Sequence, residues 1–182
     1  MSISFSGNIS PAQQVQTGKN QNVAVKNSYQ RIATGEEKPK FTKAYGNGFL
    51  QKLATTVPIL GTYLIGKRII EQDNQQEALA KGVKNESEGP GFFKSFFKGL
   101  GMKLSLVVPF YGAYRVGKEI IEQKNIQEAL ATGNNEKATE KPKFWQSWWE
   151  GTKMALSQLV PVYGTYKLGK NVATHKAIDR MV

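Results

Sequence analysis

The chain has 182 residues, of which 40% are apolar and none is cysteine. Its 25 Lys and Arg residues exceed its 14 Asp and Glu residues and give a net charge of +11, which favours an anionic partner such as nucleic acid or an acidic membrane. The missing cysteines exclude disulfides, thiolate metal sites and cysteine-linked lipid anchors, and no apolar run reaches the about eighteen residues of a spanning helix.

The beginning of the chain is rich in Ser, Gln and Asn and has few apolar clusters. Such a composition cannot bury enough apolar surface to offset the entropy of ordering. Residues 1–36 are therefore predicted to be a disordered leader, and their composition is compatible with a bacterial secretion signal.

The remainder of the chain is an internal repeat of about 51 residues. Val-Pro recurs with its proline at Pro58, Pro109 and Pro161, and residues 69–82 match residues 120–133 at eleven of fourteen positions. The predicted units are residues 37–85, 86–137 and 138–182, the third of them truncated. The segments 83–90 and 134–143 are polar and are predicted to be flexible linkers.

Each unit is predicted to form two helices, so the fold class is all-α with three tandem amphipathic hairpins. In the middle unit, large apolar residues from Phe92 to Val108 share one arc at 100° per residue, and this arc is the expected contact face of the first helix. The second helix is predicted to start near the repeated proline and to end at Gly82 or Gly133, which are good C-terminal caps. Ala113 and Gly117 are small residues four apart, a spacing that lets two helix backbones approach closely.

The spacing Gly-x-x-x-x-Gly-Lys occurs three times, but no strand precedes it and no Ser or Thr follows the lysine. A phosphate-binding loop needs both, so the prediction is a turn. The residues assigned to the repeated turn are Pro58, Gly61, Pro109, Gly112, Pro161 and Gly164.

No set of residues suggests catalysis. The single histidine, His175, is expected to be solvated, and the repeated carboxylates (Glu71, Glu77, Glu122, Glu128) are expected on a solvated face. Because no nucleophile, base or ligand cluster emerges, the chain is predicted to be non-enzymatic, with no cofactor and no bound metal.

Adjacent bulky aromatics beside lysines are the most informative signal. Trp and Phe suit the acyl boundary of a bilayer, and lysines suit its anionic head groups. The residues assigned to membrane binding are Phe92, Phe93, Phe96, Phe97, Leu100, Phe144, Trp145, Trp148, Trp149, Lys94, Lys98 and Lys103. The opposing interpretation is that these aromatic faces pack together as a hydrophobic core.

In overall character, residues 37–182 resemble the SemC group of early effectors that Chlamydia-like bacteria secrete by the type III route. The resemblance rests on the Ser-rich start, the lack of cysteine and the basic amphipathic repeat. It implies delivery into a host cell, association with the host plasma membrane, binding to phosphatidylserine-rich bilayers, membrane bending and recruitment of endocytic factors. No functional residue is carried over from it.

The sequence thus predicts a peripheral protein that inserts aromatic helices into anionic bilayers and promotes curvature. Two alternatives stay open: a helical scaffold that binds a host protein, and a basic protein that binds nucleic acid. The aromatics lie away from the lysines, which fits a nucleic-acid stacking platform poorly. Homo-oligomerisation is compatible with each of these interpretations.

Overall fold

The computed structural model describes residues 28–85 and 89–182. Every regular element in these ranges is a helix, so the predicted all-α class is confirmed. The elements are a short helical segment at residues 28–33, α2 (Phe41–Thr56), α3 (Pro58–Lys81), α4 (Phe92–Leu106), α5 (Pro109–Thr132), the 3-10 helix η1 (Asn135–Thr139), α6 (Phe144–Ser157) and α7 (Pro161–Asp179).

The long helices begin and end where the sequence indicates. Before α5, Val108 is extended, with φ −97° and ψ 102°, and Pro109 is the first helical residue. Proline suits this position because its fixed φ is helical and the first amide needs no partner. The long helices α3 and α5 end at Gly82 and Gly133, whose φ values of 65° and 71° are left-handed.

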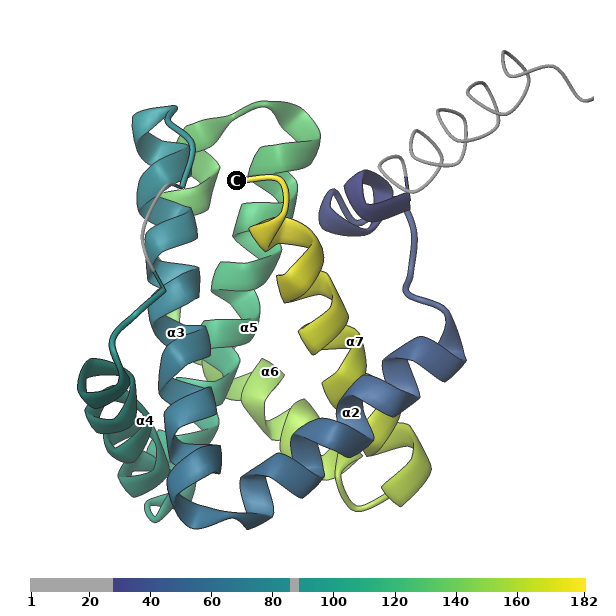
Figure 1. Cartoon of the computed structure of the whole chain (residues 1–182), viewed down its shortest axis with the longest axis vertical. Coiled ribbons are helices and arrows are strands. Elements are labelled where there is room, and N and C mark those ends of the chain that lie inside the picture. Colours follow the sequence, from purple (N-terminus) through teal and green to yellow (C-terminus); the bar gives the residue numbers. More distant parts are fainter. Residues whose placement is uncertain (1–27, 86–88) are drawn as a thin grey trace, which may run out of the picture.

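The helices divide into two sets that occupy different ends of the molecule (Figure 1). The long helices α3, α5 and α7 run in the same direction, contact one another and end near the C-terminus of the chain. The shorter helices α2, α4 and α6 lie at the opposite end, beside the start of the long helices. As a result, all three Val-Pro turns lie at that end.

The helices α4 and α6 pack most extensively on the long helix that precedes each of them, α3 and α5, whereas α2 packs on the last helix, α7. The closely packed pairs are therefore not the hairpins joined by the Val-Pro turn, as the repeat suggested. Pairing of α2 with α7 brings together helices from the first and last repeats and closes the arrangement into a ring.

Pairs of glycines make these crossings possible. A Cβ built on Gly66 would lie 2.5 Å from the amide nitrogen of Gly99, and one built on Gly99 would lie 2.9 Å from that of Gly66. Gly117 faces Gly151 in the same way, and Gly48 faces Gly169. The prediction that small residues allow close backbone approach is confirmed, with partners drawn from neighbouring repeats.

The buried face of each short helix carries mainly small residues, and it is not the large apolar arc that the core interpretation would bury. In α4 the buried residues are Ser95, Gly99, Met102 and Ser105. The large apolar arc, by contrast, is mostly exposed, and Phe93 retains 73% of its accessible surface. Small side chains bring the two backbones into contact, whereas a ring of phenylalanine size at the crossing would hold them apart. The aromatic side chains are therefore left on the outer face.

Part of the predicted leader belongs to the core. Ile32 and Ala33 are buried in one cluster with Ile126, Ala129 and Ile178, at the end of the molecule where the long helices finish. Residues 28–36 thus differ from the expected disorder, because this short apolar segment is covered by the long helices. Residues 1–27 lie outside the described part of the chain.

Residues 28–35 supply the segment that ends the long helix in the other repeats and that the third repeat lacks. The sequence Ala-Thr-Gly at 33–35 repeats that at 131–133, and Gly35 has φ 81°, close to the 71° of Gly133. The third repeat lacks this segment in residues 172–182. Residues 28–35 therefore complete the last repeat, and α2 follows them as α4 follows α3.

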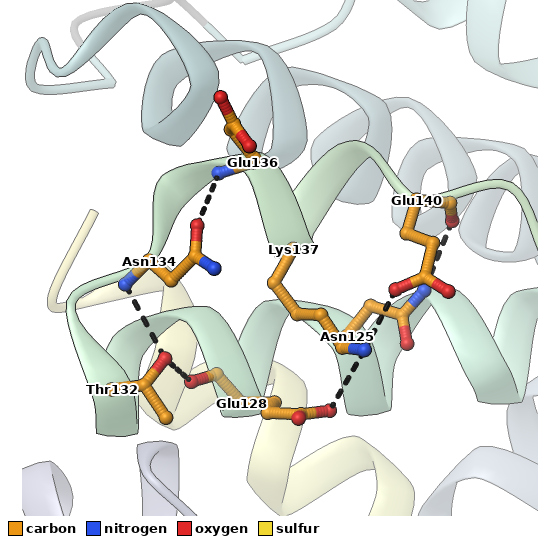
Figure 2. A network of polar contacts seen from close by, with 7 residues as sticks. All are labelled: Asn125, Glu128, Thr132, Asn134, Glu136, Lys137 and Glu140. Atoms are coloured by element: carbon orange, nitrogen blue, oxygen red, sulfur yellow. Dashed lines mark hydrogen bonds and ion pairs between the residues drawn. The ribbon is translucent and has the colours of Figure 1, made fainter.

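The linker after α5 is ordered and not flexible as predicted (Figure 2). The Asn134 side chain accepts a hydrogen bond from the Glu136 amide at 3.2 Å and caps η1. Lys137 Nζ lies 2.7 Å from Glu140 Oε2 and 3.8 Å from Glu128 Oε2. These contacts tie the linker to α5 and position the start of α6.

Candidate functional site

Large apolar side chains are exposed almost entirely on three equivalent stretches: residues 41–60, 92–111 and 144–163. Each stretch contains a short helix, the Val-Pro turn and the first residues of the long helix that follows. Among the exposed large apolar residues of the described chain, Val83 alone lies outside them. We call this surface, formed by the three stretches, the apolar end. Exposed apolar area this concentrated is typical of a surface that contacts another molecule or a membrane.

The predicted membrane-binding residues all lie on the apolar end, but their side chains differ in how exposed they are. Phe93, Phe97, Trp145 and Trp149 are well exposed, with Trp145 at 68%. Phe92 and Phe144 are about half exposed. Three more are partly buried: Phe96, Leu100 and Trp148.

In each aromatic cluster, the first ring of the short helix stacks on a tyrosine of a neighbouring long helix. Phe92 stacks on Tyr63 with ring centroids 5.2 Å apart, and Phe144 stacks on Tyr114 at 4.9 Å. The equivalent pair in the first repeat is Phe41 and Tyr166 at 5.1 Å. The recurring tyrosine is visible in the sequence, but its role as a support for the aromatic face required the fold.

Sequence reasoning also missed the exposed apolar residues of the turns. Val107 and Leu159 each keep 77% of their accessible surface, more than any of the predicted aromatics. Ile59 and Phe110 beside the turn prolines are exposed as well. The repeated run of apolar residues ahead of each Val-Pro pair was the available signal.

The predicted lysines differ in their surroundings. Lys94 and Lys98 are exposed, and Lys98 Nζ lies 3.1 Å from Asp73 Oδ2. Lys103 is half-buried, and its ammonium donates to the backbone oxygen of Pro58 at 3.4 Å. Lys103 therefore also bridges α4 to the start of α3.

Charge is segregated along the same repeat. Residues 38–68, 89–118 and 141–170 contain sixteen of the 25 basic residues and one of the 14 acidic residues, Glu150. The N-termini of α3, α5 and α7 also lie at this end, and a helix N-terminus carries a partial positive charge. The apolar end itself carries six of these basic residues together with Glu150, and the other ten lie next to it in the sequence. Outside the three ranges, the chain has a slight excess of acid.

The repeated turn residues have a structural role. A Cβ on Gly112 would lie 2.9 Å from Leu106 Cα, and one on Gly61 would lie 2.6 Å from Thr55 Cα. Gly164 meets the end of α6 in the same way. Because each of these glycines lets the end of a short helix lie against the start of the next long helix, the Gly-x-x-x-x-Gly-Lys spacing describes packing.

A cavity of about 240 Å³ lies where the three long helices meet the short ones. Its walls include Ile65, Val116 and Leu168, which are equivalent positions of α3, α5 and α7. Three residues further along the same helices, the equivalent positions are Arg68, Glu119 and Asn171. A cation, a carboxyl group and an amide therefore line the same cavity. We call this the central cavity.

Hydrogen bonds between the long helices lie around the central cavity. Gln72 Nε2 donates to the backbone oxygen of Glu119, and Gln123 Nε2 donates to that of Asn171, both at 3.0 Å. The equivalent third residue is His175, whose Nε2 lies 3.1 Å from Glu71 Oε2.

His175 is therefore not the solvated residue that was predicted, since only 6% of it is exposed. Burial lowers the pKa of His175 below its ordinary value, so the neutral ring is favoured at neutral pH. Two of the carboxylates expected on a solvated face also differ from that expectation. Glu71 and Glu122 are partly buried, and burial raises the pKa of Glu122 above its ordinary value.

Burial, followed by the nearby negative charges of Glu122 and Asp73, raises the pKa of Glu119 to about 7, against the opposing effect of Arg115 and Lys118. The folded protein thus holds a proton on Glu119 at pH values where the unfolded chain, with a pKa near 4.5, has released it. This contribution to stability is fully present below pH 4.5 and is lost as the pH rises through 7.

We therefore expect Glu119→Gln to stabilise the fold at pH 8 by about 2 to 3 kcal/mol, because the neutral amide avoids ionisation of a buried carboxyl. The advantage should shrink toward zero near pH 5, where Glu119 is protonated in the folded state. Urea unfolding of both proteins between pH 5 and 8 measures it. A stability difference that does not change with pH would contradict the raised pKa.

No protein-family model matches this chain, and neither curated proteins nor solved structures show a significant match. Within residues 28–85 and 89–182, none of the helices has the length and apolar character needed to cross a bilayer. The same residues hold no cluster of three or more His, Cys, Asp or Glu side chains that could bind a metal ion.

Proposed function

We propose that this chain is a peripheral protein that binds anionic membranes through its apolar end. The observation that carries the proposal is the coincidence, on three equivalent stretches, of exposed aromatic side chains with six lysines and a single acidic residue, Glu150. Aromatic rings suit the boundary between head groups and acyl chains, and lysines attract anionic head groups.

The magnitudes favour binding by several stretches together. Full burial of one Phe side chain contributes about 1.5–3 kcal/mol, and each Lys near an anionic leaflet adds about 1 kcal/mol. Rings such as Phe93 and Trp145 are already exposed in the folded protein, so they can enter a leaflet without unfolding. Insertion into one leaflet expands it relative to the other and promotes curvature.

A protein partner with an acidic, apolar surface is the competing occupant of the same face. The bilayer is favoured because the exposed residues are spread over three separate helices and turns at one end, as a broad surface would require. Delivery into a host cell and association with its plasma membrane extend this proposal, and they rest on the resemblance to the SemC group alone.

Co-sedimentation of the full chain with vesicles tests the proposal. We expect pelleting with vesicles that contain phosphatidylserine, weak pelleting with phosphatidylcholine alone, and loss of binding as salt is raised. The double substitution Phe93→Ser and Phe97→Ser should weaken binding at least about tenfold, because it removes two rings from the membrane-facing surface.

Val83→Ser is the matched control, since Val83 is exposed and apolar but lies after the end of α3, away from the apolar end. It should leave vesicle binding unchanged. Failure of the unaltered protein to pellet with phosphatidylserine vesicles at low salt would overturn the proposal. A shift of DNA or RNA in that case would favour the nucleic-acid alternative.

A further inference from the structure

The central cavity adjoins a groove that reaches the apolar end. A second hollow of about 410 Å³ shares Val116, Met154 and Leu168 with the cavity, and it follows the crossing of α5 and α6. A third hollow of about 510 Å³ shares Pro109 and Ala155 with the second. The three hollows adjoin one another in series, and we call them together the apolar path.

The outer end of this path lies among the exposed aromatics. Phe110, Trp148 and Leu159 line the third hollow. The inner end is lined by Arg68, the one cation of the central cavity wall. The path thus joins a cationic inner end to an apolar outer end.

Arg68 makes no hydrogen bond and no ion pair within 4.0 Å among the described residues, and its charge is compensated only at longer range by Glu119 and Glu71. A partly buried guanidinium presents several donors in a plane, and a carboxylate satisfies two of them at once. The carboxyl group of Glu119 is half-protonated near neutral pH. In its protonated form it can donate a hydrogen bond to a carboxylate that is bound at Arg68. The inner end is suited to a carboxylate.

The walls of the path are suited to one flexible chain. Met102 and Met154 line the cavity, and methionine side chains adapt to ligands of irregular shape. The path is a single groove between two helices, which suits one acyl chain better than two.

We propose that this protein binds one long-chain fatty acid, with its carboxylate at Arg68 in the central cavity and its acyl chain along the groove between α5 and α6. The proposal does not depend on membrane binding, because the ligand can be supplied as a soluble monomer.

Isothermal titration of the full chain with monomeric dodecanoate tests it. We expect one dodecanoate per chain, with binding at least about tenfold tighter than that of dodecan-1-ol, which has no charge for Arg68. Arg68→Gln should weaken dodecanoate binding at least about tenfold. Lys67→Gln is the matched control, since it removes the same charge from the neighbouring residue, which does not line the cavity, and it should leave affinity unchanged.

Ala155→Trp provides a second variant that does not touch the inner end. Ala155 is exposed and lines the two outer hollows, so a large ring there should block the groove and weaken binding of dodecanoate without lowering the unfolding temperature.

Several results would overturn the proposal. They are no binding, equal affinity for dodecanoate and dodecan-1-ol, or several ligands per chain with no difference between Arg68→Gln and Lys67→Gln. If Arg68→Gln does not fold, the comparison of the two ligands on the unaltered protein decides. Vesicle binding that is lost while dodecanoate binding persists would refute only the membrane proposal.

Discussion

Replacing Gly99 by alanine should destabilise this protein severely, while the same change at Gly101, two residues along the same helix, should stabilise it. A Cβ on Gly99 would lie 2.9 Å from the amide nitrogen of Gly66 and closer still to the backbone oxygen of Thr62. The obstacle is backbone on a long helix, so α4 has to move away from α3. Overpacking of this kind costs about 3 kcal/mol, which lowers the melting temperature by about 6–12 °C in a chain of this size.

Gly101 has nothing within 4 Å of a built Cβ. Gly101→Ala should therefore only reduce the freedom of the unfolded chain and improve helix propensity, for a gain of about 0.5–1 kcal/mol. Thermal unfolding followed by circular dichroism measures both variants. Equal effects at the two positions would show that the helices do not cross at Gly99.

Ile32→Ala should lower the free energy of unfolding by about 2–4 kcal/mol, although Ile32 lies in a stretch that reads as a polar leader. Ile32 is 7% exposed and packs in the cluster that contains Ile126 and Ile178. The backbone oxygen of Ile32 also accepts a hydrogen bond from Gln127 Nε2 at 3.0 Å. The effect arises because truncation leaves a cavity where residues 28–35 complete the last repeat.

Gln30→Ala serves as its control, since Gln30 is exposed on the same short helix. It should change stability by less than about 0.5 kcal/mol. Urea unfolding of both variants gives the comparison. A negligible effect of Ile32→Ala would mean that residues 28–36 are not part of the folded core.

The helices were largely predictable because their signals are local. Proline at Pro58, Pro109 and Pro161 and glycine at Gly82 and Gly133 act on their own backbone and the next few residues. These signals are the same in any fold that contains the helix. The bounds of α3 and α5 follow from them directly.

The sequence pattern grouped the aromatic residues on one arc, but it did not determine what that arc contacts. Helical periodicity shows that Phe93 and Phe97 share an arc, and it does not show whether that arc or the face with Ser95 and Gly99 packs inside. Both faces offer a stabilising contact, one through apolar area and one through close backbone approach. The choice depends on the shape of the neighbouring helix.

The sequence by itself determined that this protein is all-α, that its units repeat, and that the aromatic residues of each short helix share one arc. Only the tertiary structure decided which helices pair, because pairing depends on matching glycines in segments far apart in the chain, such as Gly48 and Gly169. It also decided that residues 28–35 complete the last repeat and that Arg68 and Glu119 line one cavity. These features depend on contacts between repeats, which the pattern within one repeat does not specify.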